Sequence, residues 1–389
     1  MLSVLTRKTI LIISPQSWGK MFVSKHHYAI ELAKLGNTVF FLNPPDIGRD
    51  RSLPSIEIHP SEMQENLFLI DHRISFPYNI KFHFISLFHL LMRSHISQIL
   101  KKIGRPVDIV WSFDLGNLYA FSSFPNSCLK IFHPVDEPLN QTAINSAKGA
   151  QIIFSVTGEI LEKYRHMPVP GYFINHGVAQ YFFQGSEAVP NLRGEVHVGF
   201  SGNLLREDID RDTFLEIISG HPEMIFDCWG SFEVQHSNIG GRTDPGTQSF
   251  LQKLKQLSNV RLHGVLPARE LALAFLDMDA FLVCYDVERD QSKGTNYHKI
   301  MEYLSTGKVI ISSNISTYQE RPELVQMVKE RDNNRNLPAL FSKIMNDLEY
   351  HNSQVLTDQR RRYSQSNTYT SQIERIDAYI SRLPGRIEA

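Results

Sequence analysis

Cysteines and long apolar runs are scarce in this sequence, and both shortages limit what the chain can be. The three cysteines, Cys128, Cys228 and Cys284, lie far apart and form neither a metal-binding spacing nor an even set for a disulfide framework. No window approaches the roughly 18–20 apolar residues that a membrane-spanning helix needs. The apolar run within residues 1–14 is too short for a signal peptide and is typical of a first β-strand. We therefore expect a reduced, cytoplasmic protein.

An excess of charge of either sign is also missing. The chain of 389 residues has 40 lysines and arginines against 41 aspartates and glutamates, which gives a net charge of −1. A general nucleic-acid binder usually carries a strong basic excess, so we expect no nucleic-acid partner. The length exceeds what one ordinary hydrophobic core supports and indicates two domains.

What the sequence does have is a repeated order of strand, loop and helix. Residues 9–14 read as a buried strand, residues 24–35 as a helix that ends at Gly36, and residues 38–42 as a second strand. This unit lacks the G-x-G-x-x-G fingerprint, which speaks against a dinucleotide site. The repeat predicts an α/β protein with two similar domains. In the second half, the predicted strands are 196–201, 224–229, 260–263, 280–285 and 309–311.

The domain boundaries are predicted from a change in composition near the middle of the chain. Residues 186–196 are polar and contain a proline and a glycine, so we interpret them as the linker between the domains. We predict an N-terminal domain over residues 1–185, a C-terminal domain over residues 186–365 and a closing helix within residues 366–389.

One segment, residues 294–313, combines a loop, a short helix and a buried strand in a way that favours nucleotide binding. Lys299 and Glu302 are three residues apart, so they share one face near the helix N-terminus. The free N–H groups and the positive dipole end there suit a phosphate, and a carboxylate one turn further in can accept hydrogen bonds from a ribose diol. The alternative is a capped surface helix with an ordinary Lys–Glu pair.

This segment resembles the donor-nucleotide motif of glycosyltransferases with the GT-B fold, which has two facing Rossmann-like domains with parallel sheets. The matching pattern, Lys-x-x-Glu-Tyr-Leu-x-x-Gly-Lys-Val-Ile, runs from Lys299 to Ile310. The resemblance implies that Glu302 binds the ribose hydroxyls of a sugar nucleotide, and that the closing helix crosses back to the N-terminal domain. Many retaining members carry a second glutamate eight positions earlier, where this chain has Gly294.

Further segments of the second half resemble other donor-site motifs of this family. The sequence VHVGFSGNL is similar to a family segment in which backbone N–H groups, here those of Gly202 and Asn203, reach the donor diphosphate. The resemblance implies a contact between Val265 and the nucleotide base. Arg206 and Lys293 lie where a guanidinium and an ammonium suit phosphate oxygens.

Polar residues at the ends of the first-half strands are the candidates for chemistry and for acceptor binding. Trp18 and Gly19 follow the first predicted strand and Asp114 ends another, so the resemblance places all three on the acceptor side of a cleft. Asp136 follows a later strand and is our candidate general base for an inverting reaction, with helix capping as the alternative. His176, in a segment similar to the one that closes the first domain of these enzymes, is the second catalytic candidate.

We expect no metal and no cofactor. His26 and His27 are adjacent on a predicted helix, so their side chains point about 100° apart and cannot easily share one ion. No Asp-x-Asp triplet follows a predicted strand, so the resemblance implies a metal-independent transfer. Cationic side chains and helix N-termini would then stabilise the leaving diphosphate, and the nucleotide sugar acts as a co-substrate.

Residues 80–104 are predicted to form a long amphipathic helix, which has two interpretations. The first is a core helix that covers the sheet. The second is an interfacial helix on an anionic membrane, which would place the protein at the inner face of the plasma membrane. Its predicted apolar face consists of Phe84, Leu87, Leu90, Leu91 and Ile96.

Together these features predict a glycosyltransferase that uses a UDP- or GDP-sugar. The expected acceptor is a hydroxyl of a carbohydrate or of a lipid-linked sugar, in the synthesis of a surface polysaccharide or glycolipid. Two alternatives remain open at this point: a nucleotide-sugar 2-epimerase of the same fold, and a nucleotide-sugar-binding scaffold without turnover. The sequence leaves the sugar, the nucleotide and the stereochemistry undecided.

Overall fold

The chain folds into two compact units in the computed structural model. Unit 1 comprises Met1–Asn175 and Tyr369–Ala389, and unit 2 comprises His176–Thr368. The predicted linker, residues 186–196, and the predicted boundary before it fall largely outside the described residues. The residues that the structure describes are 3–19, 22–47, 55–184, 194–233 and 244–383.

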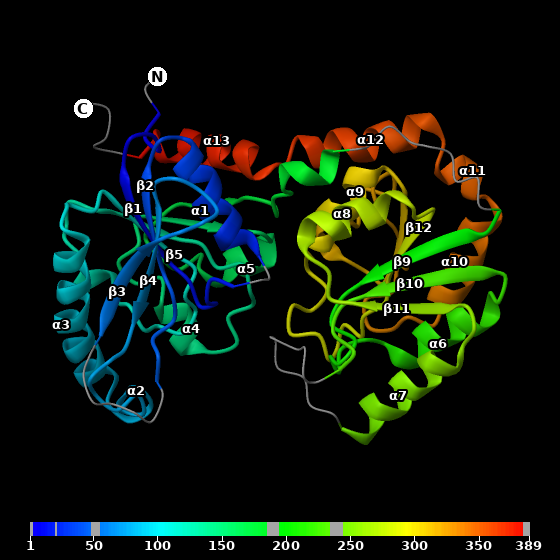
Figure 1. Cartoon of the computed structure of the whole chain (residues 1–389), viewed down its shortest axis with the longest axis horizontal. Coiled ribbons are helices and arrows are strands. Elements are labelled where there is room, and N and C mark those ends of the chain that lie inside the picture. The colour runs from blue at the N-terminus through cyan, green and yellow to red at the C-terminus, as the bar shows by residue number, and fades with distance from the viewer. Residues whose placement is uncertain (1–2, 20–21, 48–54, 185–193, 234–243, 384–389) are drawn as a thin grey trace. The chain divides into compact units, whose positions relative to one another are not determined.

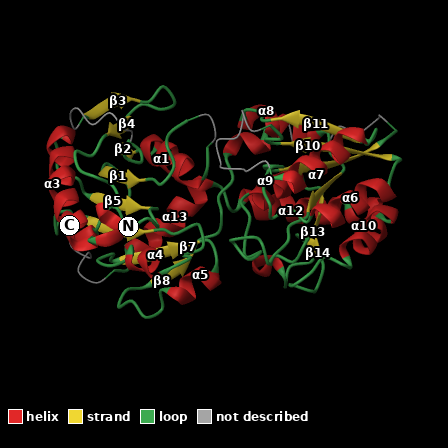
Figure 2. Ribbon diagram, turned by 90° about the horizontal axis from the view of Figure 1, so that it is seen from below, coloured by secondary structure: helices red, strands yellow, loops and turns green. Residues whose placement is uncertain are grey.

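Unit 1 is built on a mostly parallel sheet. Its strands are β1 (Thr9–Ile13), β2 (Thr38–Leu42), β3 (Ile56–Pro60), β4 (Leu67–His72), β5 (Ile109–Ser112), β6 (Leu129–Phe132), β7 (Ile152–Ser155) and β8 (Gly171–Phe173). They lie in the order β3-β4-β2-β1-β5-β6-β7-β8, which Figure 2 shows edge-on. Only β3 is antiparallel to its neighbour, and it forms an edge. The chain changes direction across the sheet between β1 and β5, so this is the topological switch point of unit 1.

Helices cover both faces of this sheet, as Figure 1 shows. They are α1 (Ser24–Lys34), α2 (Ile80–His83), α3 (Ile85–Ile103), α4 (Gln141–Asn145), α5 (Gly158–Lys163) and α13 (Tyr369–Ile380). Successive residues of β1 alternate between two cores. Ile10 and Ile12 pack with α1 and α13, whereas Leu11 and Ile13 pack with α3. This two-sided cover explains why the strand is apolar throughout. The closing helix α13 belongs to unit 1, although it comes last in the sequence.

The segment predicted as one helix over residues 80–104 is interrupted, and only Ile96 of its predicted apolar face is fully buried. Phe84 leaves helical geometry between α2 and α3, with φ −139° and ψ 67°. The side of α3 that packs on the sheet carries Phe88, Met92, Ile96 and Ile99. Apolar residues occur almost all round the first turns of α3, so spacing alone could not decide which face is buried. Among the described residues, no helix combines the length and apolar character needed to cross a membrane. The apolar side chains of the segment left exposed are those of Phe82, Phe84, Ile85, Leu87 and Leu90.

Unit 2 has a fully parallel sheet with the strand order of a Rossmann fold. Its strands are β9 (Val196–Ser201), β10 (Met224–Trp229), β11 (Val260–Gly264), β12 (Ala280–Val283), β13 (Val309–Ser312) and β14 (Gln326–Met327). They lie in the order β11-β10-β9-β12-β13-β14, and the chain changes direction between β9 and β12. In open parallel sheets, ligands bind beyond the carboxyl ends of the strands at such a switch point.

Helices flank this second sheet on both sides. They are α6 (Arg211–Gly220), α7 (Pro245–Gln256), α8 (Ala268–Leu276), α9 (Lys299–Thr306), α10 (Leu337–Asn346), α11 (Leu348–His351) and α12 (Gln354–Gln365). In Figure 1, α8, α9 and α12 lie on one face and α6, α7 and α10 on the other. The predicted helix within 294–313 is confirmed as α9, which ends at Gly307 with φ +79°, a backbone angle that favours glycine. The predicted α/β architecture with two Rossmann-like sheets is confirmed.

Candidate functional site

The switch point of unit 2 gathers several predicted donor residues around one glycine. Gly202 directly follows β9, and Tyr285 lies two residues beyond β12. A Cβ atom at Gly202 would lie 2.9 Å from the ammonium of Lys299 and 2.9 Å from the hydroxyl of Tyr285. A side chain at this position would displace these two side-chain ends, so glycine lets them approach the backbone of the loop.

Lys299 is the first residue of α9, and its ammonium is buried against this loop. It donates hydrogen bonds to the backbone carbonyl of Ser201 and to the hydroxyl of Tyr285, and it lies 4.8 Å from the centre of the Tyr285 ring. Burial lowers the pKa of Lys299, because water no longer solvates the ammonium. The fold thus positions a cationic group beside the backbone at the carboxyl end of β9, where an anion can bind.

Glu302 lies one turn further along α9 and is half-buried. No described residue donates a hydrogen bond to its carboxylate or forms an ion pair with it. Burial raises the pKa of Glu302 to about 7, and the positive charge of Lys299 opposes this rise only in part. A carboxylate that is withdrawn from water without a hydrogen-bond donor is unfavourable, so the site is electrostatically incomplete without a ligand that supplies donors.

Arg206 and Lys293, the two predicted phosphate partners, already have acceptors within the chain. The guanidinium of Arg206 donates to both carboxylate oxygens of Asp208 and lies 3.8 Å from Asp290, and the hydrogen bonds that Asp208 accepts raise the pKa of Arg206 further. Its charge nevertheless reaches Lys299, whose pKa it helps to lower. The Lys293 ammonium is exposed and donates to the Glu288 carbonyl over 2.8 Å. A phosphate would have to compete with these internal acceptors.

Asn203 and Val265 complete the predicted donor set. The side-chain oxygen of Asn203 accepts the N–H of Leu205 over 3.0 Å, which holds the loop after β9 in a tight turn. Val265 is exposed and follows Gly264, whose positive φ of +75° turns the chain at the end of β11. The structure therefore places Val265 at a carboxyl strand end of the same sheet as Gly202.

The three predicted acceptor residues of unit 1 differ in their surroundings: Trp18 and Asp114 make contacts within the unit, and Gly19 is exposed. The indole of Trp18 packs edge-on against Phe41, with ring centres 4.9 Å apart, and its backbone N–H donates to Asn43. Asp114 is buried, and its carboxylate accepts the N–H groups of Gly116 and Leu118, so it holds its own loop in shape. Gly19, in contrast, is exposed, and no atom would obstruct a side chain there.

The two predicted catalytic residues lie in different units. Asp136 is exposed in the loop after β6 of unit 1, and no described residue pairs with its carboxylate. The helix that follows is capped by Asn140, whose side chain accepts the Ala143 N–H, so Asp136 is not its cap. His176 opens unit 2, where it is buried with its ring centre 6.2 Å from that of His298.

Sequence reasoning missed two residues that shape these sites. Tyr285 was placed at the end of a strand, and only the three-dimensional contact with Lys299 shows its role. Lys25 is the second residue of α1, the helix that follows the Gly19 loop, and this place near a helix N-terminus is the signal for anion binding that the sequence offered. Within the described parts of the chain, no cluster of three or more histidine, cysteine, aspartate or glutamate side chains could hold a metal ion.

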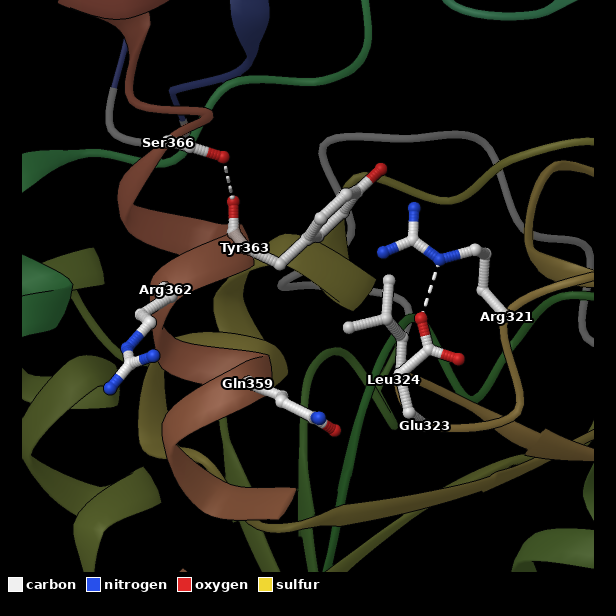
Figure 3. Close-up of a pocket in the computed structure, with 7 residues that line it drawn as sticks. All are labelled: Arg321, Glu323, Leu324, Gln359, Arg362, Tyr363 and Ser366. Carbon is white, nitrogen blue, oxygen red and sulfur yellow. Dashed lines mark hydrogen bonds and ion pairs between the residues drawn. The ribbon is translucent and has the colours of Figure 1, made fainter. Parts of the chain in front are cut away.

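A separate groove with a volume of about 580 Å³ lies on unit 2 along α12. Figure 3 shows that Arg321 pairs with Glu323 on one side of it and faces the ring of Tyr363, whose centre is 4.9 Å from the guanidinium carbon. None of the predicted site residues lines this groove, and Arg321 is already paired with Glu323, so we assign it no part in nucleotide binding. It is lined by Arg321, Glu323, Leu324, Gln359, Arg362, Tyr363 and Ser366.

Comparison with known proteins identifies the fold. No protein-family model matches the sequence, and no curated protein matches it. Among solved structures, a sucrose-phosphate synthase from Thermosynechococcus elongatus matches with a TM-score of 0.69 at 12% identity, over 97% of this chain and 99% of that one. HepE from Anabaena, in complex with UDP and glucose, matches with a TM-score of 0.66 at 11% identity, over 97% and 100% of the two chains. The lipopolysaccharide outer core galactosyltransferase WaaB matches with a TM-score of 0.60 at 14% identity, over 96% and 99%.

These likenesses span nearly the whole of each chain and include both Rossmann-like units. The protein is therefore of the class that joins two such units in one chain. More specifically, it has the GT-B fold of glycosyltransferases. The fold predicted from the resemblance of residues 299–310 is confirmed, whereas the individual site residues stay predictions.

Proposed function

We propose that the protein is a glycosyltransferase that moves a sugar from a nucleoside-diphosphate sugar to an acceptor hydroxyl. The observation that carries this proposal is the pair formed by Lys299 and Glu302 at the switch point of unit 2. A nucleotide offers what this pair lacks. Its diphosphate supplies negative charge beside a buried ammonium, and its ribose supplies two hydroxyl donors for a carboxylate that has none.

The donor is proposed to bind with its diphosphate along the loop at Gly202 and Asn203. The backbone N–H groups there and the Lys299 ammonium stabilise the diphosphate as it gains charge on leaving. Glu302 accepts hydrogen bonds from the ribose, and Val265 lies near the base. Arg206 acts through its field on this cluster, or directly once a phosphate competes with Asp208.

The chemical step is a substitution at the anomeric carbon of the donor sugar. The bond from that carbon to the diphosphate oxygen breaks, and a bond to the acceptor oxygen forms. In an inverting reaction, the hydroxyl proton passes to the carboxylate of Asp136, which is exposed and unpaired. His176 is the second catalytic candidate, and Trp18 and Gly19 belong to the acceptor side. No metal or cofactor is required in this scheme.

UDP is the first nucleotide to examine. HepE binds UDP together with glucose in its solved complex, and a trehalose-phosphate synthase from Burkholderia vietnamiensis, which matches with a TM-score of 0.63, is a UDP-forming enzyme. GDP is the next candidate. The acceptor is proposed to be a carbohydrate or a lipid-linked sugar of a surface polysaccharide or glycolipid.

The decisive experiment is titration calorimetry of the full chain with UDP, GDP, ADP and dTDP, followed by turnover assays with the sugars of the nucleotide that binds. We expect one diphosphate to bind, with Lys299→Met and Glu302→Gln weakening it. Glu216→Gln is the control, because Glu216 is an exposed glutamate on α6 of the same unit. Release of free diphosphate that depends on an acceptor supports the transferase.

Two other results would redirect the assignment. Conversion of the donor sugar without any acceptor would indicate the epimerase, and tight binding without turnover would indicate the inactive scaffold. If millimolar concentrations of all four nucleotides leave the heat signal flat, the donor site itself is refuted.

We further propose that α2 and the start of α3 dock on an anionic membrane surface. Phe82, Phe84 and Leu90 are 69%, 67% and 63% exposed, which leaves large apolar side chains in water. The sequence contains no acidic residue between Asp71 and Asp108, whereas that interval contains six lysines and arginines: Arg73, Lys81, Arg93, Lys101, Lys102 and Arg105. An apolar face within a purely basic segment suits an anionic membrane surface, because the acyl layer takes up the apolar side chains and the anionic head groups attract the basic ones.

Vesicle co-sedimentation tests this docking. We expect the full chain to sediment with vesicles that contain phosphatidylglycerol and to stay in solution with neutral phosphatidylcholine vesicles. The double variant Phe82→Ser, Phe84→Ser should lose most of this binding. Val355→Ser, which removes an equally exposed apolar side chain from α12, should not. Equal binding by both variants would refute the proposed surface.

A further inference from the structure

Lys25, the second residue of α1, is a buried ammonium that has no partner among the described residues. Its side chain is only 1% exposed, and it forms no hydrogen bond or ion pair with any of them. Burial lowers the pKa of Lys25, and the negative charge of Asp136 opposes this shift from nearby without contact. Asp136 itself is exposed in the loop after β6. A buried charge without a partner is costly, so a ligand of opposite charge would stabilise it.

A second buried polar group without a partner lies within reach of the same charge. His133 directly follows β6, is fully buried, and neither of its ring nitrogens has a hydrogen-bond partner among the described residues. Its burial and the charge of Lys25 lower its pKa to about 3, so the imidazole stays neutral and keeps one N–H to donate. Its ring packs on Phe113, with ring centres 5.0 Å apart, which fixes its orientation at the carboxyl edge of the sheet.

The start of α1 adds further donors at this edge. Ser24, the first residue of α1, is 6% exposed, and its hydroxyl also has no partner among the described residues. In the first turn of α1, the N–H groups of His26 and His27 donate to the Val23 carbonyl, whereas those of Ser24 and Lys25 have no acceptor among the described residues and lie at the positive dipole end of the helix. Lys25, the Ser24 hydroxyl and the His133 imidazole therefore each have a donor that no described residue accepts.

We propose that this cluster is a binding site for a small oxyanion, a phosphate or a carboxylate, carried by the acceptor substrate. This assignment rests on the proposed transferase function and narrows it: the acceptor is an anionic sugar or sugar phosphate. Lys25 and Ser24 bind the oxyanion, and the acceptor hydroxyl is thereby held near Asp136, which takes its proton. Lys25 is a positioning residue for the reaction, because it contacts the anion and not the reacting atoms.

Thermal unfolding of the full chain tests the site, with glucose 6-phosphate as the probe and glucose as its uncharged match. We expect glucose 6-phosphate to raise the unfolding temperature of the wild type, and glucose to leave it unchanged. Lys25→Met should lower the affinity for glucose 6-phosphate more than about tenfold, because it removes a charge-assisted contact. Lys34→Met is the matched control, since Lys34 is an exposed lysine at the other end of α1 and pairs with Glu31.

A second variant keeps the test decisive if Lys25→Met does not fold. Ser24→Ala retains the lysine and its charge, and it should still weaken the response to glucose 6-phosphate. Inorganic phosphate is the second probe, because it shows whether the oxyanion alone suffices. The inference is overturned if neither probe stabilises the wild type, or if Lys25→Met and Ser24→Ala respond as the wild type does.

Repeating the titrations with UDP shows whether the oxyanion belongs to the donor or to the acceptor. If Lys25→Met weakens UDP as strongly as glucose 6-phosphate, the anion belongs to the donor and the acceptor assignment is overturned. If the wild type binds UDP but neither phosphate probe, the proposed transferase stands and this inference fails. If it binds the phosphate probes but no nucleotide, the anion site stands, whereas the transferase and the acceptor assignment fail together.

Discussion

The carboxylate of Glu302 provides the sharpest test of the donor site, because its ionisation is linked to both stability and nucleotide binding. Its pKa is raised from 4.5 to about 7 by burial, so the folded protein binds a proton more tightly than the unfolded chain. A group with a raised pKa contributes stability at low pH and loses it as the pH rises through the folded value. The rise corresponds to a ceiling of roughly 3 kcal/mol between pH 4.5 and pH 8, of which about 1.4 kcal/mol falls between pH 6 and pH 8.

Glu302→Gln removes this titration and keeps the shape of the side chain. Without nucleotide, we expect the variant to gain stability over the wild type as the pH rises from 6 to 8. Thermal unfolding followed by tryptophan fluorescence measures this gain. The relevant transition is that of unit 2, which contains Trp229, whereas Trp18 and Trp111 report on unit 1.

Nucleotide binding should show the opposite trend. The ribose hydroxyls donate to the ionised carboxylate, and with a pKa near 7 the ionised fraction rises about tenfold from pH 6 to pH 8. We therefore expect the wild-type affinity for UDP to rise by up to about tenfold relative to that of Glu302→Gln. At pH 8 the variant should bind about 1–3 kcal/mol more weakly. Because the ionisation of UDP affects both proteins equally, the ratio of their affinities at each pH does not depend on it. Parallel pH profiles for the two proteins would refute the role of Glu302.

Three further substitutions test the remaining parts of the proposal. Gly202→Ala places a Cβ atom against the Lys299 ammonium and the Tyr285 hydroxyl. Both groups are the ends of side chains that can move, so we expect the free energy of unfolding to change by less than about 1 kcal/mol. The affinity for UDP should nevertheless fall measurably. Lys299→Met leaves the Ser201 carbonyl without its donor and should cost about 1–3 kcal/mol of stability by chemical denaturation, together with most UDP binding. Asp136→Asn should reduce kcat by at least about a hundredfold and strengthen glucose 6-phosphate binding, because it removes both the base and a like charge. Unchanged turnover in Asp136→Asn would show that another group accepts the proton.

The positions of the strands along the chain were largely predictable, because the sequence carries strong local signals for them. Runs such as TILII and TVFFL are apolar at nearly every position, and this is typical of parallel strands that are covered on both faces. The strand VHVGFS and the helix that begins at Lys299 were placed correctly for the same reason, since apolar spacing and the glycine at 307 mark their limits. Helical periodicity also predicted that Lys299 and Glu302 share one face near the start of this helix, and their role in donor binding stays a prediction.

The α2–α3 segment shows where such reasoning fails. Its first turns are apolar on several sides, and the face that packs is chosen by the sheet and not by the spacing of the helix itself. Phe88 and Met92 were therefore buried in place of Leu87 and Leu90. Leu87 and Leu90, which stay exposed, belong to the face for which the sequence left two interpretations open, a core face or a membrane-binding face.

The sequence by itself determined the α/β class, the two Rossmann-like repeats and the residues that face the carboxyl edge of unit 2, because these depend on contacts close in sequence. The tertiary structure alone decided which polar groups are paired. Arg206 is bound to Asp208, Lys299 is held by Ser201 and Tyr285, and Lys25 is buried without a partner among the described residues. Most of these pairings join residues far apart in the chain. Burial then shifts the pKa of each ionisable side chain and so sets its charge. Folding alone brings such groups together and withdraws them from water.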